Sequence, residues 1–399
     1  MGTSTRRARR HRFVIAFMAA TLAVVGGVVA AEELRIVGDA LERPGIDEFY
    51  VQPDDAAGGE PGALVKADAL LGAPLASRAW RIMYRTTDVH GEPAVATGVL
   101  VVPLVPAPPG GRTVVSWGHP TTGAARDCAP SYGFDPFVGI EGLRFLLNRG
   151  YAVVATDYVG MGTSGTDSYL VGVTGGNAVL DAVRAARAIV ETRASERVVL
   201  WGHSQGGQAV LFAAQQAADY APELNVVAVA AAAPAADLPG LMSAHLDDIS
   251  GVTIGSYAFT AYADVYPQAP VDGILTPAAR EIVPRMNELC LLSNISTLHE
   301  IGQPLVGDFT MSDPTTTEPW ASLLEQNSAG AEAFDAPLFL AQGLSDELVV
   351  PSDTTAFAQH EAELGMDVTY HEIPFADHGT VAYLALPAML RWLAEVSAR

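Results

Sequence analysis

Short apolar runs alternate with longer segments of helical periodicity along most of the chain. The short runs are rich in Val, Ile and aromatic residues, which is typical of β-strands. From the fourth run onward they are mostly continuous, as in parallel strands that are buried on both faces. The predicted strands are residues 80–86, 94–102, 113–117, 152–156, 198–201, 226–231, 338–341 and 368–373.

Apolar residues recur at three- and four-residue intervals in residues 178–192, 205–219, 352–364 and 381–396, which predicts amphipathic helices. Strands that alternate with helices favour an α/β fold with a doubly wound, mostly parallel sheet. Residues 234–335 break this alternation, since they contain helix-like pieces and Pro or Gly breaks but no strong strand. A structureless loop of that length is uncommon in a compact domain, so we expect an inserted helical cap.

The N-terminus has the order of a secretory signal peptide. An arginine cluster precedes an uncharged apolar run over residues 13–30, and small residues at Ala30 and Ala31 suit cleavage. An uncleaved membrane anchor is the alternative, because eighteen apolar residues are just enough to span a bilayer. Both interpretations place the body of the protein outside the cytoplasm. The predicted layout is a signal peptide (1–31), an N-terminal extension (32–79), the core (80–233 and 336–399) and the cap (234–335).

The composition describes an acidic globular protein. Hydrophobic residues make up 49% of the chain and charged residues 17%, with a net charge of −22. Loss of the five leader arginines with residues 1–31 would make the net charge −27. Such a charge argues against nucleic acid as a partner. No protein partner is evident in the sequence.

Cys128 and Cys290 are the only cysteines. In an exported protein an even number of cysteines allows one disulfide, and the alternative is two buried free thiols. Their spacing does not suggest a metal site, and we expect neither a metal nor an organic cofactor.

The pentapeptide from Gly202 to Gly206 has the form Gly-x-Ser-x-Gly with Ser204 at its centre. A predicted strand leads into it and a predicted helix leaves it, which is the setting of a nucleophile elbow. Small residues are needed there because strand and helix pack closely below the strained turn. We therefore predict Ser204 as a nucleophile, rather than as part of an ordinary glycine-rich turn.

A serine hydroxyl needs a base to take its proton and a carboxylate to orient that base. Asp346 follows the strand 338–341 and His378 follows the strand 368–373, so both lie at the carboxyl ends of strands. The order Ser, Asp, His is the one expected for such an elbow. Of the rival residues, Asp377 is too close in sequence to orient His378 easily, and we expect His203 to point away from the pocket.

An oxyanion needs two preorganised amide donors. The first should belong to Gln205, directly after the nucleophile. For the second we choose Thr121 in the loop after the strand 113–117, with Thr122 or His119 as alternatives, because Pro120 has no N–H. Asp157, at the end of another strand, is interpreted as structural, fixing the adjacent glycine-rich turn through its backbone.

These separated pieces resemble the secretory lipase family of α/β hydrolases, in particular a bacterial member. The resemblance rests on residues 116–123, 127–131, 157–160, 202–207 and 237–240 and on the surroundings of Asp346 and His378. It implies an α/β-hydrolase fold with a cap over the pocket, the same three catalytic residues, and a disulfide from Cys128 to Cys290. Pro120 departs from the His-Gly pattern common in lipase oxyanion loops.

The sequence thus predicts a secreted carboxylic-ester hydrolase, a lipase or esterase acting on a small-molecule or lipid ester, including triacylglycerols at a lipid–water interface. An acyltransferase or a peptidase with the same triad is an alternative, as is a non-catalytic binding protein on the same scaffold. Cap residues such as Tyr257 and Phe259 either line an acyl site or simply pack onto the core.

Overall fold

The computed structural model describes residues 45–133 and 135–397. The predicted signal peptide and the first part of the N-terminal extension lie outside these residues. Within the described ranges, no helix is long and apolar enough to cross a membrane.

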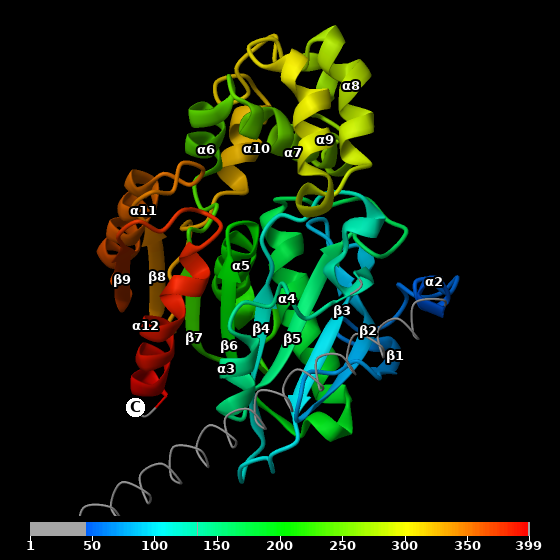
Figure 1. The fold of residues 1–399 in the computed structure, drawn as a ribbon, viewed down its shortest axis with the longest axis vertical. Coiled ribbons are helices and arrows are strands. Elements are labelled where there is room, and N and C mark those ends of the chain that lie inside the picture. Colours follow the sequence, from blue (N-terminus) through cyan, green and yellow to red (C-terminus); the bar gives the residue numbers. More distant parts are fainter. Residues whose placement is uncertain (1–44, 134, 398–399) are drawn as a thin grey trace, which may run out of the picture.

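A nine-stranded sheet runs through the molecule in the order β1-β2-β3-β5-β4-β6-β7-β8-β9 (Figure 1). The six strands from β5 to β9 in this order are parallel, while β1, β2 and β3 pair antiparallel along one edge. The predicted, mostly parallel sheet is therefore confirmed. The strands are β1 (Leu64–Leu70), β2 (Ser77–Thr87), β3 (Pro93–Pro103), β4 (Arg112–Gly118), β5 (Ala152–Val159), β6 (Ala194–His203), β7 (Asn225–Ala232), β8 (Leu338–Gly343) and β9 (Val368–Ile373).

Helices cover both faces of the sheet, so side chains from alternate positions of a central strand enter different cores. Leu200 in β6 packs in the core below α4 (Gly172–Ala188), α5 (Gln205–Tyr220) and α11 (Pro351–Glu363). Trp201, the next residue, packs on the opposite face with α3 (Leu143–Asn148) and α12 (Val381–Val396). This burial on both faces explains why the central strands are continuous apolar runs.

The chain between β7 and β8 forms helices that lie above the carboxyl ends of the strands (Figure 1). They are α6 (Leu238–His245), α7 (Ile249–Val265), α8 (Pro277–Asn287), α9 (Leu291–Gly302) and α10 (Trp320–Gln326). Phe259 of α7 is fully buried and packs on Phe309 and Trp320, with ring centroids 5.9 and 5.4 Å away. We call residues 234–335 the helical insertion. Phe259 thus contributes to the core of the insertion.

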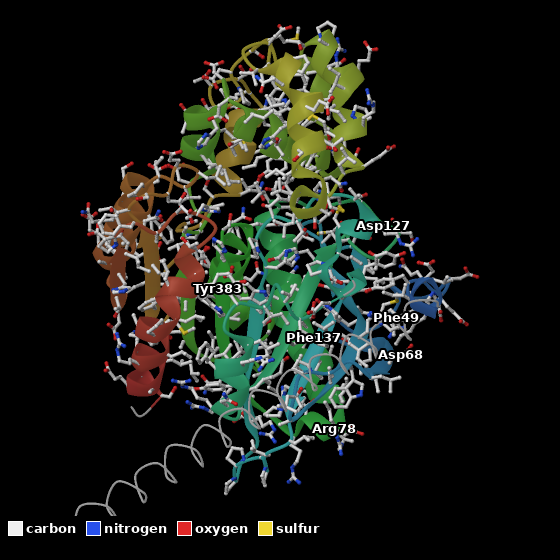
Figure 2. All side chains as sticks on the ribbon, in the orientation of Figure 1. Phe49, Asp68, Arg78, Asp127, Phe137 and Tyr383 are labelled. Carbon is white, nitrogen blue, oxygen red and sulfur yellow. A yellow bond between two sulfur atoms is a disulfide. The ribbon has the colours of Figure 1, made fainter. Side chains whose placement is uncertain are left out.

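The antiparallel edge of the sheet carries a short helix, α2 (Ile46–Phe49). Phe49 is buried and packs with Met83 and Val95 in a small separate core beside β1 (Figure 2). Strand β1 was not predicted, because Lys66 and Asp68 interrupt its apolar pattern and most of its side chains are at least partly exposed.

Candidate active site

Ser204 stands at the turn between β6 and α5, with φ +56° and ψ −119°. A non-glycine residue with positive φ is strained and marks a special site. The turn is tight because Gly202 and Gly206 approach each other. A Cβ atom on Gly202 would lie 2.1 Å from the carbonyl oxygen of Gly206, so glycine is required there.

Ser204, His378 and Asp346 form one chain of hydrogen bonds. His378 Nε2 lies 2.9 Å from Ser204 Oγ, and His378 Nδ1 lies 2.8 Å from Asp346 Oδ2. Ser204 and Asp346 are 7% and 4% exposed, whereas the His378 side chain is 19% exposed. The structure therefore brings together the three side chains that the sequence singles out, with the imidazole at the most accessible position.

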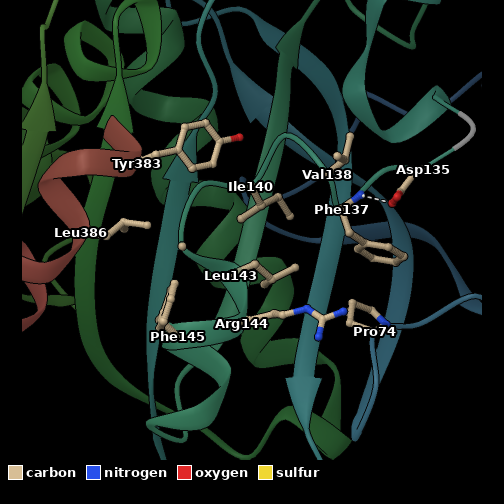
Figure 3. Close-up of a pocket in the computed structure, with 11 residues that line it drawn as sticks. Pro74, Asp135, Phe137, Val138, Ile140, Leu143, Arg144, Phe145, Tyr383 and Leu386 are labelled. Atoms are coloured by element: carbon tan, nitrogen blue, oxygen red, sulfur yellow. Dashed lines mark hydrogen bonds between the residues drawn. The ribbon is translucent and has the colours of Figure 1, made fainter. Parts of the chain in front are cut away.

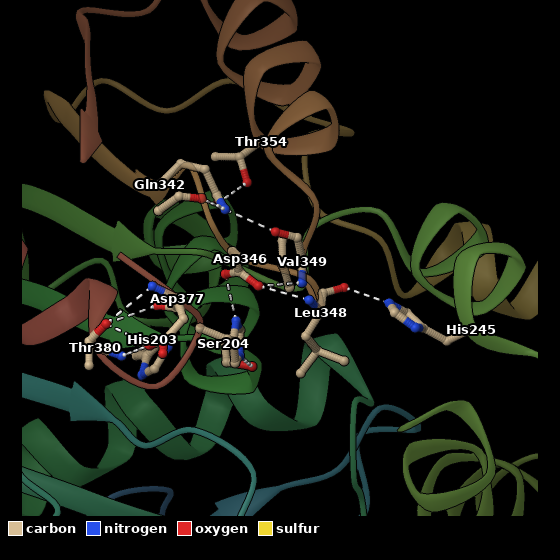
Figure 4. Close-up of polar contacts among 12 residues, drawn as sticks. His203, Ser204, His245, Gln342, Asp346, Leu348, Val349, Thr354, Asp377 and Thr380 are labelled. Carbon is tan, nitrogen blue, oxygen red and sulfur yellow. Dashed lines mark hydrogen bonds and ion pairs between the residues drawn. The ribbon is translucent and has the colours of Figure 1, made fainter. Parts of the chain in front are cut away.

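The Asp346 carboxylate is fixed in orientation by its own loop after β8. Its Oδ1 atom accepts hydrogen bonds from the amides of Leu348 and Val349, at 2.9 and 3.0 Å (Figure 4). Its second oxygen is thereby directed to His378. A carboxylate held in this way keeps the imidazole in the tautomer with the proton on Nδ1.

Asp377, the rival carboxylate, faces the start of the last helix. Its Oδ1 accepts from the amide and the hydroxyl of Thr380, at 3.0 and 2.6 Å (Figure 4). The hydroxyl hydrogen bond is the main reason why the pKa of Asp377 is lowered. Asp377 therefore holds the turn that carries His378, and the ring is oriented by Asp346.

The two predicted oxyanion donors lie in the elbow itself and in the loop after β4. Gln205 is the first residue of α5, so its amide has no carbonyl partner within the helix. The Thr121 hydroxyl is hydrogen-bonded to the Tyr169 hydroxyl at 2.7 Å, and in the described part of the chain the Thr121 amide makes no hydrogen bond. Both amides are therefore available, and their role as donors stays a prediction.

The loop after β4, residues 119–123, is held from several sides. The Tyr158 hydroxyl donates to the carbonyl of His119 at 3.0 Å, and the Leu291 amide donates to that of Thr122 at 2.8 Å. His119 Nδ1 lies 2.6 Å from its neighbour's carbonyl oxygen at Pro120. Burial lowers the pKa of His119 to about 4, so this imidazole is neutral near pH 7.

A disulfide joins Cys128, just beyond this loop, to Cys290 at the start of α9. The two Cα atoms are 5.2 Å apart, and the bond closes a separation of 162 residues. The sequence allowed free thiols as an alternative, and the described residues contain none. The loop beside the elbow is thus covalently attached to the helical insertion.

The hydrogen bonds of Asp157 differ from those that we predicted. We expected it to bond to the backbone of the glycine-rich turn that follows β5. Its carboxylate instead accepts from the amide and hydroxyl of Ser131 and from the Thr97 hydroxyl, with the amide and the Thr97 contacts at 2.9 and 2.6 Å. Burial nevertheless raises its pKa. The local sequence could not show the contacts with Ser131, because they form only when the segment after Cys128 folds back over the end of β5.

Two pockets lie near the segment 119–145. One, of about 440 Å³, is mostly apolar and lies between the 119–123 loop and the disulfide, with Trp117, Ile140 and Leu292 in its wall. The other, of about 320 Å³, lies between α3 and α12 and is lined by Phe145, Tyr383 and others (Figure 3). Ser204, Asp346 and His378 line neither. Across the described residues, no group of three His, Cys, Asp or Glu side chains is arranged to hold a metal ion.

His203 and Glu141 are the residues at the site that sequence reasoning missed. His203 was set aside as pointing away, yet its ring contacts the ring of His378, with centroids 4.9 Å apart. Glu141 lies in a loop before α3 and carries no sequence signal that could have identified it. Only the packing of β6 against that loop brings it close.

This arrangement of sheet, elbow and hydrogen-bonded side chains defines the protein as an α/β hydrolase, and the predicted fold class is confirmed. The structure resembles Candida antarctica lipase A in its closed state, with a TM-score of 0.74 and 19% identity over 87% of this chain and 85% of that one. It also resembles the rice cell wall degrading esterase LipA from Xanthomonas oryzae, with a TM-score of 0.67 and 24% identity over 85% and 97% of the two chains.

The chain belongs to the secretory lipase family, whose family model matches residues 140–397. Lipase 10 of Candida albicans is 25% identical, over 88% of this chain and 81% of that protein. A probable inactive lipase of Mycobacterium tuberculosis is also 25% identical, over 88% and 82%. The relatives of this chain thus include lipases and one protein described as a probable inactive lipase.

Proposed function

We propose that this protein is a serine carboxylic-ester hydrolase with Ser204 as nucleophile, His378 as general base and Asp346 as the carboxylate that orients it. The observation that carries the proposal is the continuous hydrogen-bonded chain of 2.9 and 2.8 Å from the Ser204 hydroxyl through His378 to Asp346. The names of its relatives, which include lipases and a trichothecene C-3 esterase of Fusarium sporotrichioides, favour an ester as the substrate.

In the proposed reaction, Ser204 Oγ attacks the ester carbonyl carbon while His378 Nε2 takes the hydroxyl proton. The negative oxygen of the tetrahedral intermediate accepts hydrogen bonds from the amides of Gln205 and Thr121. His378 then gives its proton to the departing alcohol, which leaves an acyl group on Ser204. Water, activated by the same base, releases the acyl group as a carboxylic acid. The groups needed are all in the chain, and the reaction requires no cofactor.

The helical insertion is the part proposed to select the substrate, because it lies above the carboxyl ends of the strands, where Ser204 and His378 stand. Tyr257 of the insertion packs edge-on against Tyr169, with centroids 5.8 Å apart, and Tyr169 is bonded to Thr121. The insertion therefore packs against the wall of the proposed oxyanion site. Lipid esters, including triacylglycerols, are the proposed substrates, and a lipid–water interface the proposed place of action.

Export is part of the same proposal. The basic and apolar N-terminal residues, the family and the disulfide all favour an extracytoplasmic protein. N-terminal sequencing of protein recovered from the medium should begin near Glu32. An intact Met1 on membrane-bound protein would indicate the uncleaved anchor instead.

A fluorophosphonate probe on the purified protein tests the chemistry. Wild-type protein should be labelled at Ser204, Ser204→Ala should not be labelled, and His378→Ala should be labelled far more slowly. Hydrolysis of p-nitrophenyl esters from C2 to C16, with and without emulsified triglyceride, then separates esterase from lipase. An unlabelled, inactive but folded wild-type protein would defeat the proposal and favour a non-catalytic role, as in the relative described as inactive.

A further inference from the structure

A second histidine–carboxylate pair lies directly behind His378. The His203 ring packs against the His378 ring, with centroids 4.9 Å apart and ring planes at 43°. His203 Nδ1 in turn lies 3.1 Å from Glu141 Oε1. Both ring nitrogens of His378 are engaged by Ser204 and Asp346, and the His203 ring packs beside them at a tilt.

This pair is built into the core and does not sit on the surface. The His203 and Glu141 side chains are 3% and 5% exposed. Trp201, two residues before His203 on the same face of β6, donates its indole N–H to the Glu141 carbonyl at 2.9 Å. One strand thus holds Glu141 by both its backbone and its carboxylate. Glu141 Oε2 is buried and has no hydrogen-bond partner among the described residues. A buried carboxylate that is only partly bonded is costly, which is a reason to ask what this one does.

The hydrogen bonds indicate the protonation of His203. Its Nδ1 faces a carboxylate and therefore carries a proton to donate. Its Nε2 is buried and has no hydrogen-bond partner among the described residues, so a second proton there would be left unpaired. His203 is accordingly best accommodated as a neutral ring with the proton on Nδ1. A neutral His203 places no like charge beside the imidazolium that would form on His378.

We propose that Glu141 and His203 are positioning residues for His378: they fix the face of its ring, and the Glu141 charge, acting through His203, favours the imidazolium that forms when Ser204 gives up its proton. This proposal rests on the proposed function. Its physical basis is that the Glu141 charge lies in a buried region, where its attraction to a positive charge on His378 is screened much less than in water.

The other charged and titratable groups facing this cluster are few. Asp346 holds the opposite side of His378, at 2.8 Å. Tyr383 of α12 lies close enough that the Glu141 charge, together with burial, raises its pKa, so it is neutral at the pH of the assays. Asp377 is exposed and bonded to Thr380. Glu141 is therefore the one buried carboxylate beside Asp346 within this part of the described structure.

Glu141→Gln tests the charge, since glutamine keeps the shape and an acceptor for His203. The acidic limb of the kcat/KM profile on p-nitrophenyl butyrate reports the base of the free enzyme. We expect this limb to move down by about one pH unit and kcat to fall about tenfold, with KM within about twofold. Glu347→Gln is the matched control, because it removes an exposed charge from the loop of Asp346 and should leave the profile in place.

His203→Ala and His203→Phe test the contact between the rings. Alanine should lower kcat with little change in KM, and phenylalanine should restore part of the loss because it keeps a ring against His378. If both variants keep the wild-type kcat, or if Glu141→Gln only lowers Tm while the pH profile stays in place, the proposal is overturned.

The effect of Glu141 on His378 can also be measured in protein that has no catalytic activity. In ¹⁵N-histidine-labelled Ser204→Ala protein, the His378 resonance can be identified by its loss in a His378→Gln variant and titrated by NMR. Glu141→Gln should lower its pKa by the same amount of about one unit. If Glu141→Gln shifts the His378 pKa but the wild-type protein hydrolyses no ester, the proposed function is wrong and the positioning role stands. If the His378 pKa is unchanged and the wild type is active, the positioning role is wrong and the proposed function stands.

Discussion

The carbonyl oxygen of Gly118 lies against Gly206 so closely that a Cβ atom on Gly206 would be 1.9 Å from it. This contact joins the end of β4 to the first turn of α5, and it sets the distance between the 119–123 loop and Ser204. Both groups are backbone, so neither can move aside without shifting a strand or a helix.

Gly206→Ala should therefore destabilise the protein strongly. We expect a loss of about 3 kcal/mol or more in the free energy of unfolding, measured by urea denaturation, or a failure to fold. Gly165→Ala is the control, since no atom lies within 4 Å of the added Cβ; its effect should stay within about 0.5 kcal/mol. Equal stability of the two variants would contradict the close contact.

Asp346→Asn should abolish most of the activity while leaving the fold intact. The amide cannot hold His378 in the required tautomer, and a loss in kcat of about 10³- to 10⁴-fold is expected on p-nitrophenyl butyrate. Asp377→Asn removes a charge but keeps an oxygen that can accept from Thr380, and it touches no bond of the His378 ring, so it should cost far less. If Asp377→Asn were the more damaging change, Asp377 rather than Asp346 would be the orienting carboxylate.

Replacing both Cys128 and Cys290 by serine should lower the stability by up to about 5 kcal/mol, because the disulfide closes a separation of 162 residues and constrains the unfolded chain. Calorimetry should give a lower Tm for the variant, and reductant should lower the Tm of the wild type but not that of the variant. If the variant and the untreated wild type have the same Tm, the disulfide does not stabilise the folded protein.

His119 should make the protein less stable in acid. Its pKa is about 4 in the folded state and near 6.5 in the unfolded chain, so its contribution is complete above pH 6.5 and is lost as the pH falls towards 4. The expected loss reaches about 3 kcal/mol. His119→Gln does not titrate, so the wild type should lose more stability than this variant between pH 7 and pH 4.5 in urea denaturation. Parallel losses would contradict a buried neutral His119.

Glu361 should make the protein less stable as the pH rises, which is opposite to the effect of His119. Neither of its carboxylate oxygens has a hydrogen-bond partner within the described structure, and burial raises its pKa to about 7. A raised carboxyl pKa favours folding below pH 4.5, and that contribution is lost as the pH rises through 7. Glu361→Gln should therefore gain about 1 to 2 kcal/mol over the wild type at pH 8 and little at pH 5. No gain at pH 8 would mean that the carboxylate is solvated.

The parallel part of the sheet was predictable because strands such as β6, buried on both faces, are apolar at nearly every position. The edge strand β1 was not, since Lys66 and Asp68 interrupt its pattern, and α3 is only six residues long, too short to show helical periodicity. Short elements and edges depend on what packs against them, which the local pattern does not record.

The candidate site divides in the same way. Ser204, Asp346 and His378 were found because each follows a predicted strand, and the order of the three along the chain is informative. Glu141 and Ser131, a partner of Asp157, were not, because both lie in residues 119–142, a long connection with little regular structure. Their contacts arise only when that connection folds over β5 and β6.

The disulfide also has a mechanical consequence for the helical insertion. The insertion is attached to the sheet where the chain leaves β7 and enters β8, two neighbouring strands, and a second time through Cys128 and Cys290 near α9 (Figure 1). The disulfide therefore restrains α9 relative to the loop beside Ser204. Reduction of this bond would leave the insertion joined to the core only by its packing and by the β7 and β8 connections.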